Sequence, residues 1–320
     1  MGVAFDMTLF LVRRMAGFAA TLFIATLVIF LLLDLLPGDP ARFILGINAT
    51  PEAVAALRTQ MGLDAPAHER FLAWVGGMLV GDFGLSTTQR LPVAELIAER
   101  MAVTLPLSLI AMVVSVVVGL PIGILAAMRR GKATDTALMV LAQTGLAIPN
   151  FWFGMLLTLV FAVTLRWLPT GGFIPWDEDA GAAMRGMILP GLALALPQAS
   201  ILARVMRTAL VDVTEQDFIR TARAKGASEA RVILRHALKG GLLPVVSFLG
   251  PALAGIISGS FVIETIFQIP GLGREFVNSA FNRDYTLVTG TVILYAVLII
   301  TFNLLVDIAV VWLNPKLRLE

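Results

Sequence analysis

Residues 101–128 read MAVTLPLSLIAMVVSVVVGLPIGILAAM and contain no charged side chain. A helix crosses the hydrocarbon layer of a bilayer, about 30 Å thick, with about 20 residues, and this run is longer than that. Because lipid offers no hydrogen-bond partners, a spanning segment must satisfy its backbone polar groups internally, as a helix does. The stretch therefore predicts a membrane-spanning α-helix.

Similar apolar runs recur along the chain, so six spans are expected: 15–36, 101–128, 137–165, 187–211, 242–267 and 286–313. The 320 residues are 58% hydrophobic and 14% charged, against roughly 45–50% and 25% in soluble domains. The mean hydropathy is +0.87. We expect an all-α polytopic membrane protein. Its first run is interpreted as a retained helix, because it is longer than a signal-peptide core and LLLDLLPGDP at its exit lacks an A-x-A site.

The distribution of Lys and Arg predicts the orientation, because cytoplasmic loops carry an excess of these residues. With the N-terminus inside, the inner segments (1–14, 129–136, 204–241, 314–320) hold 15 Lys/Arg and 7 acids. The outer segments (37–100, 166–186, 268–285) then hold 9 Lys/Arg and 12 acids. Both termini are therefore expected in the cytoplasm.

The outer segment 37–100 is expected to be an extracytoplasmic helical insert. Thr50 is a candidate N-cap, Pro51 fits the first helical position, and Gly62 fits the position after the last turn. A second amphipathic stretch covers 67–80. The expected division is 1–36 (cytoplasmic stub and first span), 37–100 (insert), 101–313 (a five-helix core with a cytoplasmic loop at 211–241) and 314–320 (cytoplasmic tail).

Small residues in the fifth run suggest a helix contact. Gly255 and Gly259 form a G-x-x-x-G, a spacing that lets two helices approach closely. The spacing leaves open whether the partner helix lies in this chain or in another. Pro149, Pro190 and Pro197 lie within or beside membrane runs, where neighbouring helices make kinks tolerable.

Polar side chains in or at the edge of the spans are few: Asp34, Glu264, Asn303 and Asp307. Ionisable residues inside a membrane are candidates for a transport pathway by default. We favour interhelical or backbone hydrogen bonding over a pathway role, because the acids lie near the ends of their spans.

Residues 220–244, RTARAKGASEARVILRHALKGGLLP, form a basic island with six Lys/Arg against one acid, Glu229. Two short helices are predicted here. Thr214 and Asp217 resemble a capping box that starts the first, and Gly226 fits the left-handed position that ends it. Ser228 can cap the second helix, which Gly240, Gly241 and Pro244 are expected to end.

The second helix is predicted to be amphipathic. Its apolar stripe (Ala230, Ile233, Leu234, Ala237, Leu238) should face the bundle and its basic stripe (Arg231, Arg235, Lys239) the cytoplasm. An amphipathic helix resting on anionic lipid would explain the charge. A docking element for a cytoplasmic partner would also explain the Gly226 corner. A DNA-reading helix-turn-helix fits poorly, because membrane spans adjoin both ends.

Catalytic and metal-binding motifs are missing from the sequence. Cysteine is absent, which excludes disulfides, thiolate metal sites and cysteine nucleophiles. There is no G-x-x-x-x-G-K-[ST] for ATP phosphates and no H-E-x-x-H. The only histidines, His68 and His236, lie outside the expected spans. We expect no catalytic residues, no metal site and no cofactor bound to this chain.

The sequence resembles the permeases of type I ABC importers of the dipeptide/oligopeptide/nickel group. The resemblance covers the whole chain and includes, in order, LLPGDPA (35–41), MGLDAP (61–66), GDFGLS (81–86), TLPLSL (104–109), DFIRTARAKGASEARVILRHALKGGLLPVV (217–246), GSFVIETIFQIPGLGREFVNSAFNRDYTLVTG (259–290) and NLLVDIAVVWLNPKLR (303–318).

The resemblance implies a transport subunit of a bacterial or archaeal inner membrane. It would pair with a second, homologous permease, two cytoplasmic ABC ATPases that use ATP and Mg²⁺, and an extracytoplasmic solute-binding protein. No nucleic acid partner is implied. Di- or oligopeptides are the favoured substrates among peptides, glutathione, nickel complexes and sugars. The alternative, a standalone secondary carrier or channel, would require an intramembrane ionisable relay.

The resemblance also assigns the island to the helices that couple such permeases to their ATPases. The matching residues here are Ala222, Lys225, Gly226, Ala227, Ser228, Glu229 and Arg231. Arg220-Thr221-Ala222 stands where the general importer pattern begins Glu-Ala-Ala. The closing proline of that pattern would fall near Lys239, whereas the nearest proline is Pro244.

Overall fold

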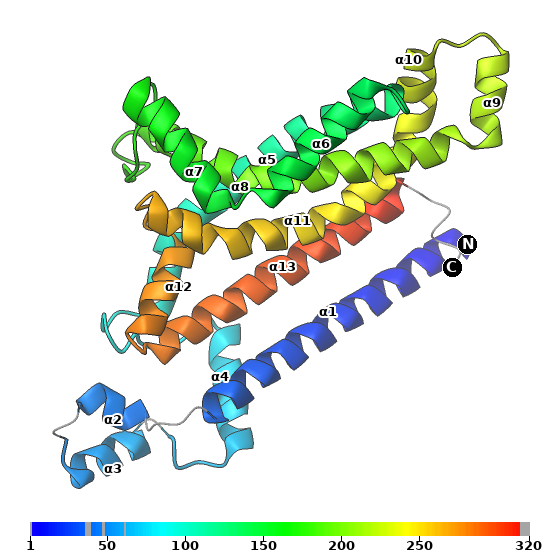
Figure 1. Cartoon of the computed structure of the whole chain (residues 1–320). Helices are drawn as coiled ribbons and strands as arrows, with labels where there is room; N and C mark the ends of the chain where they lie inside the picture. Colours follow the sequence, from blue (N-terminus) through cyan, green and yellow to red (C-terminus); the bar gives the residue numbers. More distant parts are fainter. Residues whose placement is uncertain (1, 36–39, 47–48, 61, 314–320) are drawn as a thin grey trace. The chain divides into compact units, whose positions relative to one another are not determined.

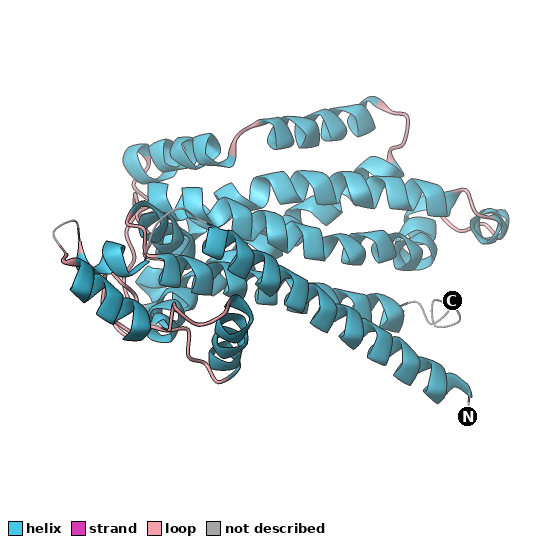
Figure 2. Ribbon diagram, turned by 90° about the horizontal axis from the view of Figure 1, so that it is seen from below, coloured by secondary structure: helices cyan, strands magenta, loops and turns pink. Residues whose placement is uncertain are grey.

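The computed structural model describes residues 2–35, 40–46, 49–60 and 62–313, and over these residues it is helical, with one isolated β-bridge between Leu85 and Pro92 (Figures 1 and 2). The helices are α1 (Gly2–Leu35), α2 (Pro40–Leu45), α3 (Pro51–Gln60), α4 (Ala67–Leu79), α5 (Val93–Met128), α6 (Ala133–Ala147), α7 (Asn150–Leu157), α8 (Ala180–Thr214), α9 (Asp217–Ala224), α10 (Glu229–Arg231), α11 (Leu238–Ile266), α12 (Leu272–Phe281) and α13 (Tyr285–Leu313). Two π-helical segments, η1 (Thr158–Thr164) and η2 (Val232–Ala237), follow α7 and α10.

The chain divides into two compact units. The first, here called the core unit, comprises Met1–Phe10, Val103–Arg274 and Thr301–Glu320. The second, the insert unit, comprises Leu11–Ala102 and Glu275–Ile300.

Five helical stretches are long and apolar enough to cross a membrane: Val12–Leu32, Val93–Met128, Ala180–Thr214, Glu229–Ile266 and Tyr285–Leu313. They correspond to five of the six expected runs. The run 137–165 is not one straight helix, because α6 and the α7–η1 segment meet at an angle of 99°. If this bent pair counts as one span, the total is six, as expected.

Pro149 explains the break in the third run. The residue before a proline is pushed out of the helical region by the proline ring, and Ile148 has φ −78° and ψ 123°. Pro190 and Pro197, by contrast, lie inside the continuous helix α8. The sequence alone does not separate these outcomes, because each depends on what surrounds the freed carbonyl groups.

Helix α8 is the centre of the core unit and packs against α6, α7 and α11. Its buried face is rich in alanine, so neighbouring helices approach closely. A Cβ atom on Gly119 of α5 would lie 2.6 Å from the carbonyl oxygen of Ala199, and one on Gly123 would lie 2.4 Å from that of Ala203. Both contacts are possible only for glycine.

The insert unit contains the two helices expected in the segment 37–100. Thr50 Oγ1 accepts a hydrogen bond from Ala53 N (3.3 Å) at the start of α3, and Gly62 has a φ of +65°. The expected stretch 67–80 is α4. The segment 37–100 also includes the first turns of α5, which starts at Val93.

Candidate functional site

The basic island forms a helical corner in the core unit. Helix α9 ends at Ala224, and Gly226 follows with φ +80°, the left-handed conformation expected there. The N–H of Gly226 donates to the carbonyl of Arg223 (2.9 Å), and the N–H of Ala227 donates to the carbonyl of Ala222 (3.3 Å). These two hydrogen bonds close the end of the helix. The expected capping box is wrong: Thr214 is the last residue of α8, and its hydroxyl donates to the carbonyl of Val211 (2.7 Å).

The second helix of the island does not end where the sequence suggested. Helices α10, η2 and α11 follow one another without a break, so Glu229–Ile266 is one 38-residue stretch (Figure 1). Gly240, Gly241 and Pro244 lie inside it. Gly241 is present for packing, because a Cβ atom there would lie 2.8 Å from Leu210 Cδ2 of α8. The island is therefore continuous with a membrane-spanning helix.

The π-helical turn changes which residues face the bundle. Val232, Ile233 and Ala237 are buried, whereas Ala230 and Leu234, expected on the same apolar face, are exposed. A π-helix has i→i+5 hydrogen bonds and more residues per turn than an α-helix, so the 3.6-residue period used for the prediction does not apply. The basic stripe of Arg231, Arg235 and Lys239 is exposed, as expected.

The residues assigned to coupling divide into two sets. Ala222 and Ala227 are half-buried against the apolar cluster at this end of the core unit, which includes Leu210, Ile219 and Ile233. The others are exposed: Lys225, Gly226, Ser228, Glu229 and Arg231.

Arg223 of this loop was not among the residues assigned to coupling. Its guanidinium donates to both carboxylate oxygens of Glu229 (2.7 and 3.2 Å) and to the carbonyl oxygen of Thr214 (3.2 Å). The hydrogen bond to Glu229 raises the pKa of Arg223 above its usual value. Arg223 thus ties the two arms of the corner to each other and to the end of α8.

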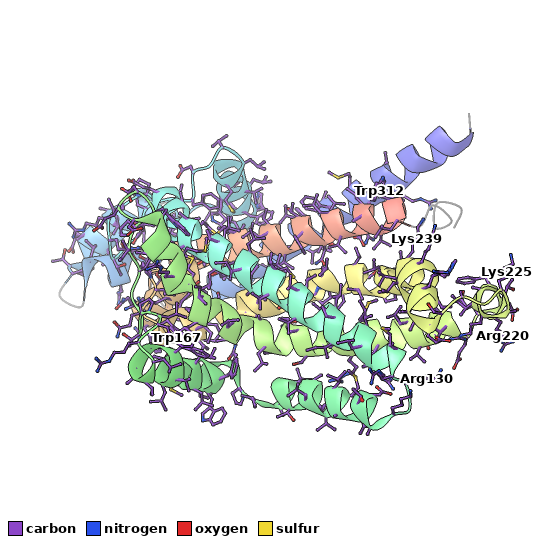
Figure 3. All side chains as sticks on the ribbon, turned by 90° about the horizontal axis from the view of Figure 1, so that it is seen from above. Arg130, Trp167, Arg220, Lys225, Lys239 and Trp312 are labelled. Atoms are coloured by element: carbon purple, nitrogen blue, oxygen red, sulfur yellow. The ribbon has the colours of Figure 1, made fainter. Side chains whose placement is uncertain are left out.

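The loop end of the core unit carries most of the unit's exposed basic side chains. Figure 3 shows Arg130, Arg220 and Lys225 gathered at this end, while Trp167 lies at the opposite end of the unit. Arg130 pairs with Glu215 (2.7 Å). Two large apolar side chains, Phe218 (51% exposed) and Leu234 (54%), are uncovered on the same loop. Exposed apolar groups ringed by charge are typical of a docking surface.

The G-x-x-x-G of α11 faces helices of this chain. A Cβ atom on Gly255 would lie 2.4 Å from Gln198 Nε2 of α8. One on Gly259 would lie 2.9 Å from Asn150 Nδ2 of α7 and 3.2 Å from Leu194 Cδ2 of α8. The same spacing in Gly119 and Gly123 of α5 could have been found in the sequence by the same test.

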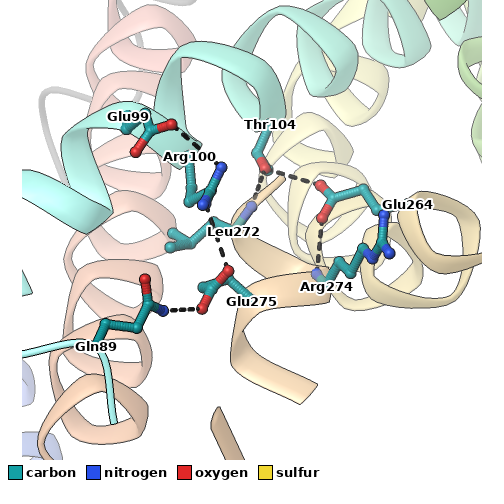
Figure 4. Close-up of polar contacts among 8 residues, drawn as sticks. All are labelled: Gln89, Glu99, Arg100, Thr104, Glu264, Leu272, Arg274 and Glu275. Atoms are coloured by element: carbon teal, nitrogen blue, oxygen red, sulfur yellow. Dashed lines mark hydrogen bonds and ion pairs between the residues drawn. The ribbon is translucent and has the colours of Figure 1, made fainter. Parts of the chain in front are cut away.

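Glu264 is completely buried near the end of α11, where it lies against the turn that precedes α12 (Figure 4). Thr104 Oγ1 donates to one carboxylate oxygen (2.8 Å) and the backbone N–H of Arg274 to the other (2.9 Å). The N–H of Leu272 in turn donates to Thr104 Oγ1 (2.8 Å). Glu264 and Thr104 therefore satisfy N–H groups in the first turn of α12, which otherwise lack partners.

The remaining polar candidates of the spans lie on α13 or outside the described side chains. Asn303 is half-buried, and its Oδ1 would be 1.8 Å from a Cβ atom on Gly250 of α11, so α11 and α13 are in close contact there. Asp307 is half-buried one turn further along α13. The side chain of Asp34 lies outside the described residues. No group of three or more His, Asp or Glu in the described part of the chain could hold a metal ion.

The long apolar helices define the class of protein: a multi-pass helical membrane protein. The family model described as "Binding-protein-dependent transport system inner membrane component" matches residues 119–319, and the model of the corresponding N-terminal part matches residues 7–108. The chain belongs to this family and is an inner-membrane permease subunit of an ABC importer of the dipeptide/oligopeptide/nickel group.

Relatives and solved structures agree with this assignment. The chain is 42% identical over 309 residues to the glutathione transport system permease protein GsiC of Salmonella choleraesuis, covering 97% of this chain and 98% of the relative. It is 40% identical, with the same coverage, to GsiC of Escherichia coli K12. The inward-facing MetNI methionine ABC transporter matches with a TM-score of 0.56 and 18% identity, over 68% of this chain and 96% of that chain. This match shows the type I importer permease fold.

Proposed function

We propose that this chain is one of two membrane halves of an ATP-driven importer that takes up peptide-like solutes by alternating access. It pairs with a second, homologous permease, two cytoplasmic ATPases and an extracytoplasmic solute-binding protein. Membership of the binding-protein-dependent family supports this set of partners. The glutathione permeases among its relatives support the substrate class, because glutathione is itself a tripeptide.

The observation that carries the proposal is the unbroken helix from Glu229 to Ile266. One end belongs to the exposed basic corner, and the other contains the buried Glu264. No loop separates the corner from the span, so a displacement of the corner is passed to the span. The π-helical segment η2 and Pro244 are the places where this stretch can bend. The Arg223–Glu229 pair links the two arms of the corner.

The docking surface in this proposal consists of the exposed corner residues Lys225, Gly226, Ser228, Glu229 and Arg231, with Phe218 and Leu234 as its apolar contacts. Ala222 and Ala227 hold the corner on the core unit. From the excess of Lys and Arg we infer that this surface and both termini lie in the cytoplasm, and that the insert lies outside, where the binding protein can reach it. Gly255 and Gly259 serve helix packing within the subunit.

Replacement of Gly226 tests the coupling. A branched residue is strained at φ +80°, so Gly226→Val should change the corner without a clash, because no atom lies within 4 Å of a Cβ there. We expect uptake by the reconstituted complex to fall about tenfold, equivalent to about 1.4 kcal/mol, while ATP hydrolysis continues without its normal stimulation by the loaded binding protein.

Gly172→Val is the matched control, since Gly172 also has a positive φ (+88°) and open surroundings but lies in the segment between η1 and α8. Equal losses of stimulated hydrolysis in both variants, or none in either, would refute the docking surface.

The substrate class is tested separately by mass spectrometry of the ligand retained on the cognate binding protein. A peptide is expected, and a nickel complex or a sugar would contradict that part of the proposal.

A further inference from the structure

The insert unit contains an apolar cavity of about 340 Å³ between α1, α4 and α13. Its walls are side chains of α1 from Phe18 to Thr26, Met78 and Leu79 of α4, and Ile293 and Val297 of α13. Thr26 is the one lining residue with a polar side chain, and its hydroxyl donates to the carbonyl of Leu22 (2.6 Å). The cavity therefore offers a ligand only apolar contacts.

A second cavity, of about 670 Å³, adjoins the first, since Phe83 lines both. Its lining includes Arg70, Glu69 and Asp82, together with Trp74 and Tyr285. On α1 the second cavity is lined by Phe30, which is nearer the C-terminal end of the helix than the residues that line the first cavity. On α13 it is lined by residues between Tyr285 and Thr289, which are nearer the N-terminal end of the helix than Ile293. At a rise of about 1.5 Å per residue, the polar cavity thus lies nearer one end of both spans and the apolar cavity nearer their middle.

Helix α1 is held beside these cavities by aromatic contacts rather than by general packing. Only 6% of the apolar stretch of α1 is buried inside the structure. The ring of Phe71 on α4 lies 5.9 Å from that of Phe23 and 5.3 Å from that of Phe30. Arg70 lies over the ring of Phe30, 5.7 Å from its centre. These contacts join α1 to α4 and leave the space towards α13 open.

We propose that the two cavities together bind one phospholipid that carries a primary amine, as phosphatidylethanolamine does. An acyl chain occupies the apolar cavity between α1 and α13, and the headgroup occupies the polar one. The order of the cavities along the spans matches the order of tail and headgroup in a leaflet.

The charges of the polar cavity favour this headgroup. Arg70 is the one cation among the residues that line it, and it suits the phosphate, because a guanidinium can donate two parallel hydrogen bonds to phosphate oxygens. Glu69 and Asp82 are its two anions, and they suit an ammonium group with three donors. A headgroup with a net negative charge would face more acid than base.

The test compares two adjacent alanines in the full importer complex, purified in mild detergent and analysed by native mass spectrometry. Both are exposed, but Ala19 lines the apolar cavity and Ala20 does not. In Ala19→Trp the indole occupies the cavity, and we expect occupancy by one phosphatidylethanolamine to fall about tenfold. Ala20→Trp should retain the lipid as the unmodified complex does. Equal retention in both variants overturns the proposal.

A second measurement needs no substitution and so remains valid if Ala19→Trp does not fold. The unmodified complex is equilibrated with nanodiscs containing equal amounts of phosphatidylethanolamine, phosphatidylcholine and phosphatidylglycerol, and the retained lipids are quantified. Preferential retention of phosphatidylethanolamine is expected. The trimethylated amine of phosphatidylcholine has no N–H donors, and the glycerol headgroup of phosphatidylglycerol has no positive charge. Equal retention of the three, or a preference for phosphatidylglycerol, overturns the headgroup assignment.

Discussion

Asp284, directly before α13 in the insert unit, is completely buried and accepts four hydrogen bonds. Ser86 Oγ (2.5 Å), Thr88 Oγ1 (2.7 Å) and Thr88 N (3.2 Å) donate to one carboxylate oxygen, and Leu287 N (3.2 Å) donates to the other. Burial by itself raises the pKa of Asp284, but these hydrogen bonds outweigh it, so the net pKa lies below the usual carboxyl range. The carboxylate thus fastens the segment around Ser86 to the start of α13.

This lowered pKa predicts a loss of stability in acid. A carboxyl whose folded pKa is depressed stabilises the fold fully above its ordinary value of about 4, and the contribution disappears as pH falls through the folded value. At neutral pH, Asp284→Asn should cost about 1–3 kcal/mol, because donors are left unsatisfied. The difference in thermal midpoint between the unmodified protein and Asp284→Asn should then become smaller below about pH 4. A difference that stays constant as the pH falls would contradict the depressed pKa.

Glu264 shows what a single sequence leaves undetermined at this scale. Its position identified it as an ionisable residue near the end of a span, which fits a pathway as well as a structural role. The deciding facts are its partners: Thr104, 160 positions away, and the backbone N–H of Arg274. Such pairings depend on tertiary contacts that no local pattern encodes. The geometry favours a structural role.

At the scale of elements, apolar periodicity and length located the spans, while their continuity depended on the neighbouring helices. Pro149 breaks one run, whereas Pro244 and Pro251 lie within α11 without ending it. Gly240 and Gly241 resembled a helix end because glycine is common there. In the folded chain Gly241 instead gives Leu210 room.

Two glycines in helices should respond in opposite ways to the same substitution. Gly123→Ala forces a Cβ atom to 2.4 Å from the backbone oxygen of Ala203, so α5 and α8 must separate. We expect a loss of about 1–3 kcal/mol, typical of overpacking. Gly76→Ala in α4 is the control, since its Cβ meets nothing within 4 Å, and alanine there should be neutral or gain up to about 1 kcal/mol. Thermal midpoints in detergent measure both, and similar midpoints for the two variants would contradict the close α5–α8 contact.

At the scale of the whole molecule, composition and the length of the apolar runs were sufficient for the fold class, because apolar runs long enough to span a bilayer have to be helices. The exposed corner at Gly226 was also predictable, since a positive φ favours glycine strongly. The continuity of that corner with α11 was not, because the π-helical turn between them has no clear sequence signature. The run of helical turns that joins the corner to α11 therefore emerges only from the structure.

The proposed orientation of the core unit in the membrane can be tested with two of its exposed positions, Lys225 in the corner and Asp177 before α8. The chain has no cysteine, so a single introduced thiol is its only target for a maleimide. If the excess of Lys and Arg marks the cytoplasmic side, a membrane-impermeant maleimide applied to intact spheroplasts should label Asp177→Cys at once. Lys225→Cys should react only after permeabilisation. The cysteine-free chain measures background, and labelling of Lys225→Cys in intact spheroplasts would place the corner on the side away from any cytoplasmic ATPase and so refute the proposed coupling.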